Sequence, residues 1–202
     1  MNVLICGLGY AGTRFLKAFS NMNKDIVGAR KINFAYVNRN PKRRDIQYFK
    51  EVDAAIEQFE PHIIVISVND EFHMDIIKKL EGYKGFVICE KPLANTNDDL
   101  ELLEAKLKSV SGFCLNLIER YSDATIVLKK FVEEHNLQLI RANFYWGKNR
   151  MNDYRPTVGV ISEIIHPLDL IQWICASNTD LELKSIQGTR SDFSVSGSSP
   201  EE

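Results

Sequence analysis

The sequence lacks the features that mark several specialised classes of protein. No apolar run approaches the ~18 residues of a membrane span, and the net charge of -2 gives no electrostatic reason to expect nucleic acid as a partner. The four cysteines stand singly in apolar runs, a spacing that fits neither a disulfide framework nor a zinc site. The opening residues, Met-Asn-Val-Leu-Ile-Cys-Gly, predict a strand and have no signal-peptide layout. We therefore expect a cytoplasmic protein with buried thiols, no bound metal, and no nucleic-acid or membrane partner.

What the chain does have is a regular alternation of two hydrophobic periods. Short continuous apolar runs, such as Asn-Val-Leu-Ile-Cys at 2–6, are typical of strands covered on both faces. Amphipathic stretches of helical period separate these runs. The alternation predicts an α/β fold with a doubly wound parallel sheet and right-handed crossovers. The predicted strands are residues 2–6, 32–37, 62–68, 85–89 and 112–117, and the predicted helices are residues 11–22, 51–59, 71–81 and 97–109.

A change of pattern near residue 120 predicts a second domain. A helix over 121–135, a long strand over 137–146 and a helix over 158–176 precede an alternating stretch at 181–189. Such alternation is typical of a sheet with one face in water. The last residues are polar and rich in glycine and serine, which favours disorder. We predict a first domain over 1–119, a partial C-terminal α/β domain over 120–190 and a disordered tail over 191–202.

Glycines at 7, 9 and 12 form a Gly-x-Gly-x-x-Gly motif between the first strand and the first helix. Gly7 permits a tight turn, Gly9 lets the backbone approach a diphosphate, and Gly12 lets the helix lie close to the sheet. Free N–H groups at the start of that helix, which includes Tyr10 and Ala11, would bind the diphosphate. The motif alone is weak, but both of its structural conditions are met here. It predicts a dinucleotide-binding, Rossmann domain, and a glycine-rich turn without a ligand is the alternative.

The segment after the second strand bears on which dinucleotide binds. A fold that binds NAD usually has an acidic residue there to hold the ribose hydroxyls. This chain has Asn38 and Arg39 instead, followed by three further cations within residues 42–44. A guanidinium suits a 2′-phosphate, so we expect NADP to be preferred over NAD, with Arg39 as the main contact and Asn38 beside it. A solvated basic turn is the alternative.

A charged pair, Glu90 and Lys91, follows the strand at 85–89 directly. In a doubly wound sheet, ligands bind outside the carboxyl ends of the strands, which is where this pair falls. A lysine at that position can lie over the reactive ring of the coenzyme and bond a substrate oxygen. Glu90 is in a position to hold it, and Pro92 would fix the turn. On spacing alone, a surface ion pair at a strand end is an equally good interpretation.

Several segments together resemble the Gfo/Idh/MocA family of oxidoreductases. The glycine turn is followed by Glu-Lys-Pro-Leu-Ala at 90–94, which is the family's most specific signature. Residues 68–73 resemble the family's Thr-Pro-Asn-x-x-His loop, with Asp70 in the place of the asparagine and His73 in the place of the histidine. An arginine shortly after a strand, at Glu119-Arg120, also matches. The resemblance extends over about residues 1 to 176.

The resemblance implies an N-terminal dinucleotide-binding domain and a C-terminal α/β domain with a large open sheet. Family members mostly oxidise or reduce sugars, inositols and related polyols. The resemblance implies that Lys91 is catalytic and that Arg120 contacts substrate. It also implies a coenzyme site that includes Val68, Asn69, His73, Glu90 and Lys91.

The predicted helix at 158–176 carries a variant of a further family pattern, Asp-x-x-x-His with another aspartate three residues on. His166 and Asp169 match this pattern, but Ser162 stands in the place of the first acid. Ser162 and His166 share a helix face, whereas Glu163 lies about 100° round the helix. We expect His166 to act as the proton carrier and Ser162 and Asp169 to lie on the substrate side, although a structural role, bonding nearby backbone, is the favoured interpretation of Asp169. A histidine satisfied within an apolar core is the alternative.

These residues together predict an NAD(P)-dependent oxidoreductase that transfers hydride between nicotinamide and a sugar, polyol or sugar derivative. Lys91 would orient the reacting oxygen, and His166 would carry its proton. Two alternatives stay open because Ser162 replaces an acid and the second domain is short. One is a dinucleotide-binding regulator or partner protein with little or no catalysis, and the other is a fragment of a longer oxidoreductase. We also expect self-association through the C-terminal domain.

Overall fold

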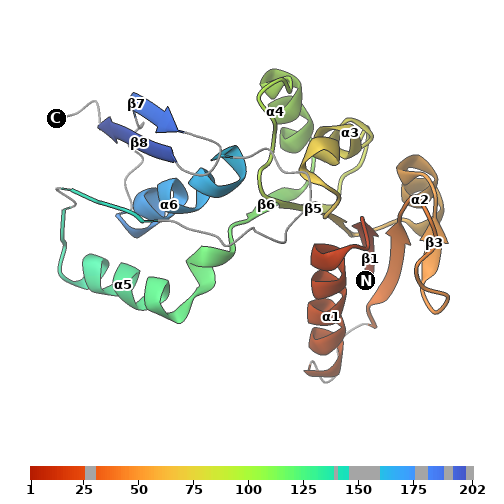
Figure 1. Cartoon of the computed structure of the whole chain (residues 1–202). Helices are drawn as coiled ribbons and strands as arrows, with labels where there is room; N and C mark the ends of the chain where they lie inside the picture. Colours follow the sequence, from red (N-terminus) through yellow and green to blue (C-terminus); the bar gives the residue numbers. More distant parts are fainter. Residues whose placement is uncertain (26–30, 139–140, 146–159, 176–181, 189–192, 199–202) are drawn as a thin grey trace. The chain divides into compact units, whose positions relative to one another are not determined.

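The structure of the protein is a computed structural model that describes residues 1–25, 31–138, 141–145, 160–175, 182–188 and 193–198 (Figure 1). The chain divides into two compact units, of which the first runs from Met1 to Asn116 and the second begins at Leu117. Within the described ranges, no helix is both long enough and apolar enough to cross a membrane.

The first unit is built on a six-stranded, wholly parallel sheet with the strand order β3-β2-β1-β4-β5-β6. The order reverses between β1 and β4, which is the arrangement of a Rossmann fold. The predicted doubly wound α/β fold is therefore confirmed. The short strand β3 was not predicted, because three residues are too few to show a period. The strands are β1 (Asn2–Cys6), β2 (Asn33–Val37), β3 (Gln47–Phe49), β4 (Ile63–Ile66), β5 (Phe86–Glu90) and β6 (Gly112–Asn116).

Two apolar clusters cover the two faces of this sheet. Val3 and Ile5 of β1 pack on one face with Leu16 and Phe19 of α1. The alternate residues of β1, including Leu4, pack on the other face with side chains from α2, α3 and α4. Burial on both faces explains why the strands are continuous apolar runs. The helices of this unit are α1 (Tyr10–Asp25), α2 (Val52–Phe59), α3 (His73–Lys78) and α4 (Leu100–Lys108), with a short 3₁₀ turn η1 (Asp70–Phe72) before α3.

The glycine turn joins β1 to α1 at very short range. Gly7 has φ +96°, in the left-handed region, and a Cβ added there would lie 2.6 Å from the backbone nitrogen of Val68. A Cβ added to Gly12 would overlap the carbonyl oxygen of Gly7. The first turn of α1 therefore lies against the end of β1, at a distance that no side chain at position 12 permits. By contrast, a Cβ added to Gly9 would have no neighbour within 4 Å.

The second unit consists of helices and one two-stranded antiparallel sheet in its described part. Ser122 caps the first α-helix, because its hydroxyl accepts a hydrogen bond from the backbone N–H of Thr125 at 3.3 Å. The elements are the 3₁₀ turn η2 (Ile118–Tyr121), the helices α5 (Asp123–Glu134) and α6 (Val160–Ile174), and the strands β7 (Glu182–Gly188) and β8 (Phe193–Ser198).

Two predictions for this unit were wrong. The predicted disordered tail contains β8, which pairs antiparallel with β7 along most of its length. Its Ser- and Gly-rich composition favours disorder only until a neighbouring strand satisfies its backbone groups. The predicted strand at 137–146 is not a strand over 137–138 and 141–145, the residues described there. An apolar run of the right length becomes a strand only where another strand pairs with it.

The cysteines differ in burial more than the sequence suggested. Cys6 and Cys89 are buried, and burial raises the pKa of the Cys6 thiol to about 12. Burial also raises the pKa of Cys89. Cys114 and Cys175 are only half-buried, so the expectation of four buried thiols is right for two of them. All four are free thiols.

The two glycines Gly9 and Gly12 form a matched pair for testing the packing of α1. Gly12→Ala should lower the free energy of unfolding by about 1–3 kcal/mol, the cost of forcing a methyl group into a filled space. Gly9→Ala should change it by less than about 0.5 kcal/mol, because the added methyl meets open space. Urea denaturation followed by circular dichroism measures both. Equal stability of the two variants would contradict the close packing described here.

Candidate functional site

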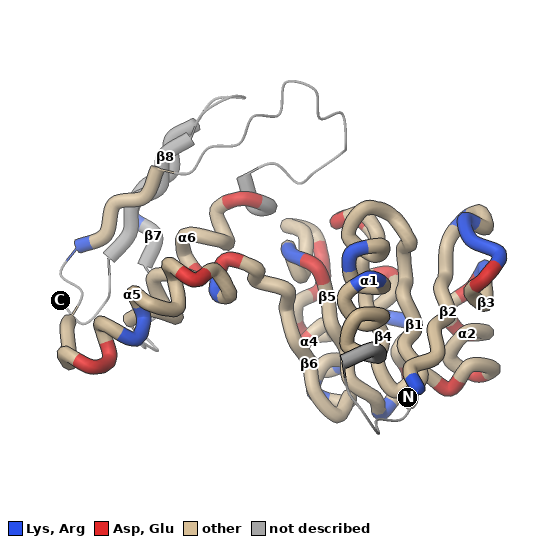
Figure 2. The backbone as a smooth tube through the Cα atoms, turned by 90° about the horizontal axis from the view of Figure 1, so that it is seen from below, with Lys and Arg blue, Asp and Glu red and all other residues tan. Residues whose placement is uncertain are grey.

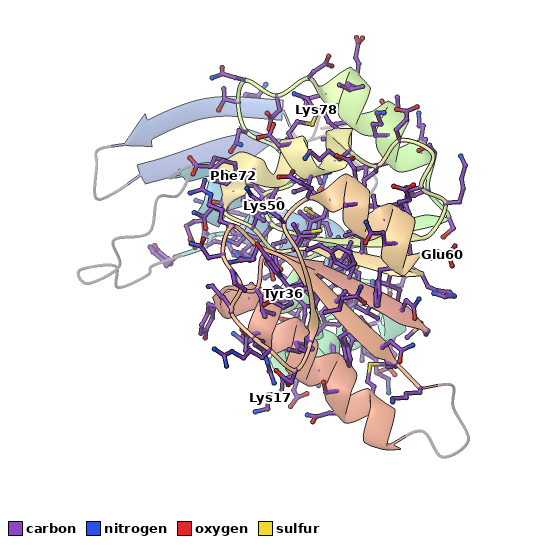
Figure 3. All side chains as sticks on the ribbon, turned by 90° about the vertical axis from the view of Figure 1, so that its right-hand side faces the viewer. Lys17, Tyr36, Lys50, Glu60, Phe72 and Lys78 are labelled. Carbon is purple, nitrogen blue, oxygen red and sulfur yellow. The ribbon has the colours of Figure 1, made fainter. Side chains whose placement is uncertain are left out.

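The predicted coenzyme residues of the first unit gather at one edge of the sheet. All six strands are parallel, so their carboxyl ends meet at the same edge. Gly7 follows β1, Asn38 follows β2, Ser67 follows β4 and Lys91 follows β5. Figure 3 shows in which direction the strands run. Glu60 precedes β4 and Phe72 follows it, and the two residues lie at opposite ends of the unit. This edge is where ligands bind in open α/β sheets.

The glycine turn leaves donors free at the start of α1. Thr13 is the first residue of the helix whose N–H bonds to a carbonyl of the turn, that of Gly9 at 3.0 Å. The N–H groups before it, from Tyr10 to Gly12, have no intrahelical acceptor. The first turn of α1 contains no acidic residue, and Tyr10 is 72 % exposed. An anion therefore meets backbone donors and the positive end of the helix without a carboxylate to repel it.

Ser67 holds the turn from the neighbouring strand. Its hydroxyl is buried and donates to the carbonyl of Gly7 at 2.9 Å, with the carbonyl of Cys6 at 3.2 Å. The backbone N–H of Gly7 donates to Val37 at 2.9 Å. The turn is thus fixed from β2 on one side and from the end of β4 on the other. Sequence reasoning missed Ser67, since a serine after an apolar strand has no distinctive spacing.

The basic loop after β2 is organised around a buried tyrosine. The hydroxyl of Tyr36 accepts from the backbone N–H groups of Lys42 at 2.8 Å and Arg43 at 2.9 Å, and donates to the carbonyl of Arg43 at 3.0 Å. Tyr36, which is labelled in Figure 3, has no exposed surface. The loop therefore has a defined course, and Figure 2 shows its cations together between β2 and β3.

The cations of this loop have different surroundings. Arg43 forms a salt bridge with Asp45, with Nε 2.9 Å from Oδ1, and this hydrogen bond lowers the pKa of the Asp45 carboxyl. The Arg39 guanidinium stacks over the ring of Phe72, 5.1 Å from the ring centre. Asn38 donates to the carbonyl of Asn40 at 2.8 Å, within its own loop. Arg39 is exposed, so it is the cation here that is both accessible and held by an aromatic neighbour.

His73 is not placed to contact a coenzyme. It was predicted as part of the coenzyme site, but none of its surface is exposed. Its Nδ1 is 2.7 Å from the carbonyl of Pro92, and its Nε2 is 3.2 Å from the carbonyl of Val68. Val68 and Asn69, from the same predicted set, lie in the loop after β4, where Asn69 is exposed. A ring enclosed between two backbone carbonyls serves the loops and not a ligand.

Glu90 and Lys91 are both half-buried at the carboxyl end of β5. The Lys91–Pro92 peptide bond is cis. The carboxylate of Glu90 accepts a hydrogen bond from Asn116 Nδ2 at 2.9 Å, and the two residues face each other in the β5–β6 register. Glu90 was expected to hold Lys91, and the structure adds Asn116 as a partner of its carboxylate. Asn116 could not be recognised in the sequence, because its relation to Glu90 depends on which strands are neighbours.

In the second unit, the predicted substrate residues Arg120 and Asp169 bind each other. The guanidinium donates through Nε to Asp169 Oδ2 at 2.8 Å and through Nη2 to Oδ1, a bidentate ion pair between η2 and α6. Only 11 % of the Asp169 side chain is exposed. Arg120 also lies 5.9 Å from the ring centre of Trp173. The pair therefore holds the unit together and leaves few donors of Arg120 for a ligand.

His166 is buried in α6 with 3 % of its surface exposed, and Glu163, three residues earlier, is 8 % exposed. Residues three apart lie on the same side of a helix, so both face the interior of this unit. The side chain of Ser162 lies outside the described residues. Over the part of the chain that the structure describes, no cluster of three or more His, Cys, Asp or Glu residues could hold a metal ion.

Comparison with known proteins finds similarity to several dehydrogenases. Inositol 2-dehydrogenase of Salmonella typhimurium is 21 % identical over 182 residues, which cover 84 % of this chain and 53 % of that protein. The crystal structure of myo-inositol 2-dehydrogenase from Lactobacillus plantarum superposes with a TM-score of 0.72 at 20 % identity, over 90 % of this chain and 58 % of that one. The Lactobacillus casei myo-inositol dehydrogenase in complex with NAD(H) and myo-inositol gives 0.69 at 16 % identity, over 93 % and 56 %.

These likenesses establish the fold, and the chain spans about half the length of the curated relatives it matches. Residues 1–114, more than half of the 202, match the family described as an oxidoreductase family with an NAD-binding Rossmann fold, GFO_IDH_MocA. The matched residues hold the glycine turn and the Glu-Lys-Pro segment at the carboxyl edge of the sheet. The chain therefore belongs to the Gfo/Idh/MocA family of NAD-binding oxidoreductases.

Proposed function

We propose that this protein is an NAD(P)-dependent oxidoreductase that transfers hydride between nicotinamide and a polyol or sugar derivative. The observation that carries the proposal is the position of Lys91. It is half-buried and follows β5, at the same sheet edge as the open glycine turn after β1. A turn that accepts a diphosphate and a lysine two strands away suit a coenzyme that extends across this edge.

The residues present fit the coenzyme. Gly9 leaves open space above the turn, and Tyr10, Ala11 and Gly12 supply backbone N–H groups toward it. Gly7 would set the turn. Arg39 and Asn38 would lie at the ribose end, and Val68, Asn69, Glu90 and Lys91 at the nicotinamide end. When bound, the coenzyme accepts or supplies the hydride.

The chemical work of the chain itself falls to two side chains. Lys91 carries a charge and three N–H donors, so it orients the reacting oxygen and stabilises negative charge on it. His166 takes up the hydroxyl proton during oxidation and returns it during reduction. The proposed domain division follows these roles, with residues 1–119 for coenzyme and 120–190 for substrate. Arg120 and Asp169 support the substrate side through their ion pair, and Ser162 belongs to the same side.

The comparisons support a polyol as the substrate class, since one solved neighbour was crystallised with NAD(H) and myo-inositol. The test is an assay of NADH or NADPH formation with myo-inositol, scyllo-inositol and a panel of aldoses. Turnover of at least one of them above the rate of a Lys91 variant is expected. Coenzyme binding without turnover of any of them would favour a second candidate, a dinucleotide-binding regulator. The observation behind that candidate is Ser162, which stands where the family has an acid.

Lys91→Met tests the catalytic assignment. It keeps most of the side-chain length but removes the charge and all donors, so turnover should fall about 10²-fold or more. Coenzyme affinity, measured by fluorescence titration, should change little. His166→Ala should likewise lower turnover and leave coenzyme affinity nearly unchanged. Lys78→Met, on the exposed face of α3, is the matched control and should leave both quantities unchanged. Full turnover by the Lys91 variant would remove the basis of the proposal.

Arg39→Ala tests the choice of coenzyme. We expect NADPH to bind more tightly than NADH, and the difference should narrow in this variant, because the partner of the 2′-phosphate is lost. Arg43→Ala is the control. It removes the same charge from the same loop, but that charge is held by Asp45. Titration of each variant with both coenzymes measures the effect. Equal affinity of the unmodified protein for NADH and NADPH would contradict the proposal.

The exposed apolar side chains of α5 support self-association. Val127 is 67 % exposed, Phe131 50 % and Leu128 49 %, and these three lie on one side of the helix. Such a patch on one helix is typical of a contact surface. Light scattering should give a mass above that of the monomer, and Val127→Asp should lower it. A monodisperse monomer at high concentration would contradict the prediction.

A further inference from the structure

Lys91 lies between two residues that are each fixed by a buried or half-buried side chain from another element. Pro92, which follows it, presents its carbonyl to Nδ1 of His73 at 2.7 Å. Glu90, which precedes it, accepts from Nδ2 of Asn116 at 2.9 Å. His73 begins α3 and Asn116 ends β6, so the residues on either side of Lys91 are held by two different elements.

The chemistry of His73 favours the bond to Pro92. Both of its neighbours are carbonyl oxygens, which only accept, and a neutral imidazole has a single N–H to give. The contact to Pro92, at 2.7 Å, is shorter than that to Val68, at 3.2 Å. Burying a polar ring completely costs free energy unless the ring is hydrogen-bonded. The hydrogen bond to Pro92 therefore offsets the cost of burying His73. A leucine would fill the same space without this cost.

A second bond ties the same two loops together. Asn95 Nδ2 donates to the carbonyl of Asp70 at 3.2 Å, and the backbone N–H of Asn95 donates to Asp98 at 2.7 Å. The loop that carries Lys91 is therefore joined to the loop after β4 at two places, through His73 and through Asn95.

Such attachment matters for a long side chain. A lysine ammonium lies about 6 Å from its Cα, so a backbone rotation of about 10° moves it by about 1 Å, which is enough to lower a rate considerably. We propose that His73 and Asn116 are positioning residues that set the direction of Lys91 by fixing Pro92 and Glu90. The catalytic consequence rests on the proposed function, whereas the placement of Lys91 does not.

The placement is measured without a substrate. Acetic anhydride at low dose labels each lysine at a rate set by its exposure and basicity, and mass spectrometry after digestion reads each site. His73→Asn and His73→Gln form the matched pair. The Asn amide nitrogen stands near the place of Nδ1 and keeps the donor to Pro92, while the Gln amide nitrogen stands near Nε2 and reaches Val68. Asn116→Leu removes the donor to Glu90 at similar volume.

We expect the labelling rate of Lys91 to change at least about 3-fold in His73→Gln and Asn116→Leu, and to stay near that of the parent in His73→Asn. Lys78, on the same unit, should be labelled equally in all variants. If a polyol is turned over, kcat should fall roughly 10-fold in the first two variants with coenzyme affinity unchanged. NADH should also protect Lys91 from labelling less in His73→Gln and Asn116→Leu than in the parent.

Unchanged labelling of Lys91 in both His73→Gln and Asn116→Leu would overturn the proposal. So would equal changes at Lys91 and Lys78, because they would indicate general loosening of the fold. If His73→Gln fails to fold, Asn116→Leu and His73→Asn still decide between these outcomes. A parent protein that turns over no polyol would contradict the proposed function, and the labelling experiment would still decide the roles of His73 and Asn116.

Discussion

The absence of a side chain at Gly12 is the constraint on which the arrangement of the coenzyme edge depends. A Cβ at that position would overlap the carbonyl oxygen of Gly7, so the start of α1 can rest against the end of β1 only with glycine there. This contact sets where the first N–H groups of the helix point. The same added Cβ would also lie 2.9 Å from the Ser67 hydroxyl, which bonds the Gly7 carbonyl. At Gly9 an added Cβ would have no neighbour within 4 Å, and in Rossmann folds the second glycine of this motif lets the backbone approach a diphosphate.

Buried and half-buried polar side chains then define the loops around this turn. Tyr36 sets the course of the basic loop, Ser67 holds the glycine turn, and His73 and Asn116 hold the residues on either side of Lys91. Each belongs to a strand, a strand end or the first turn of a helix. Because the apolar sheet fixes the positions of these residues, their hydrogen bonds give the loops beyond them a defined course. A half-buried or buried bond is also harder for water to replace than an exposed one.

The second unit uses its polar residues differently. The bidentate pair of Arg120 and Asp169 joins η2 to α6, and Lys129 donates to the backbone carbonyl of Trp173 to join α5 to α6. These bonds serve packing among helices. In the described part of α6, Glu163 and His166 are further buried polar residues.

The sequence by itself determined the architecture of the first unit. Apolar runs of strand length and amphipathic helices recur with little interruption, and this pattern is typical of a parallel sheet with helices on both faces. The spacing of Gly7, Gly9 and Gly12 likewise follows from local backbone geometry, so the motif can be recognised in the sequence. Local composition failed where pairing decides structure, as in β8 and at residues 137–146, since a strand depends on a distant neighbour.

Only the tertiary structure decided how the site residues are shared between ligand and scaffold. His73 lies in a segment that resembles a coenzyme loop, but it faces Pro92 and Val68 because α3 packs its first turn inward. Asn116 and Glu90 are 26 residues apart and meet only because β5 and β6 are neighbours in register. Arg39 is one of four cations in its loop, and the ring of Phe72, from beyond β4, distinguishes it. Each of these contacts joins residues from different elements. The spacing of residues along the sequence does not show which elements become neighbours in the fold.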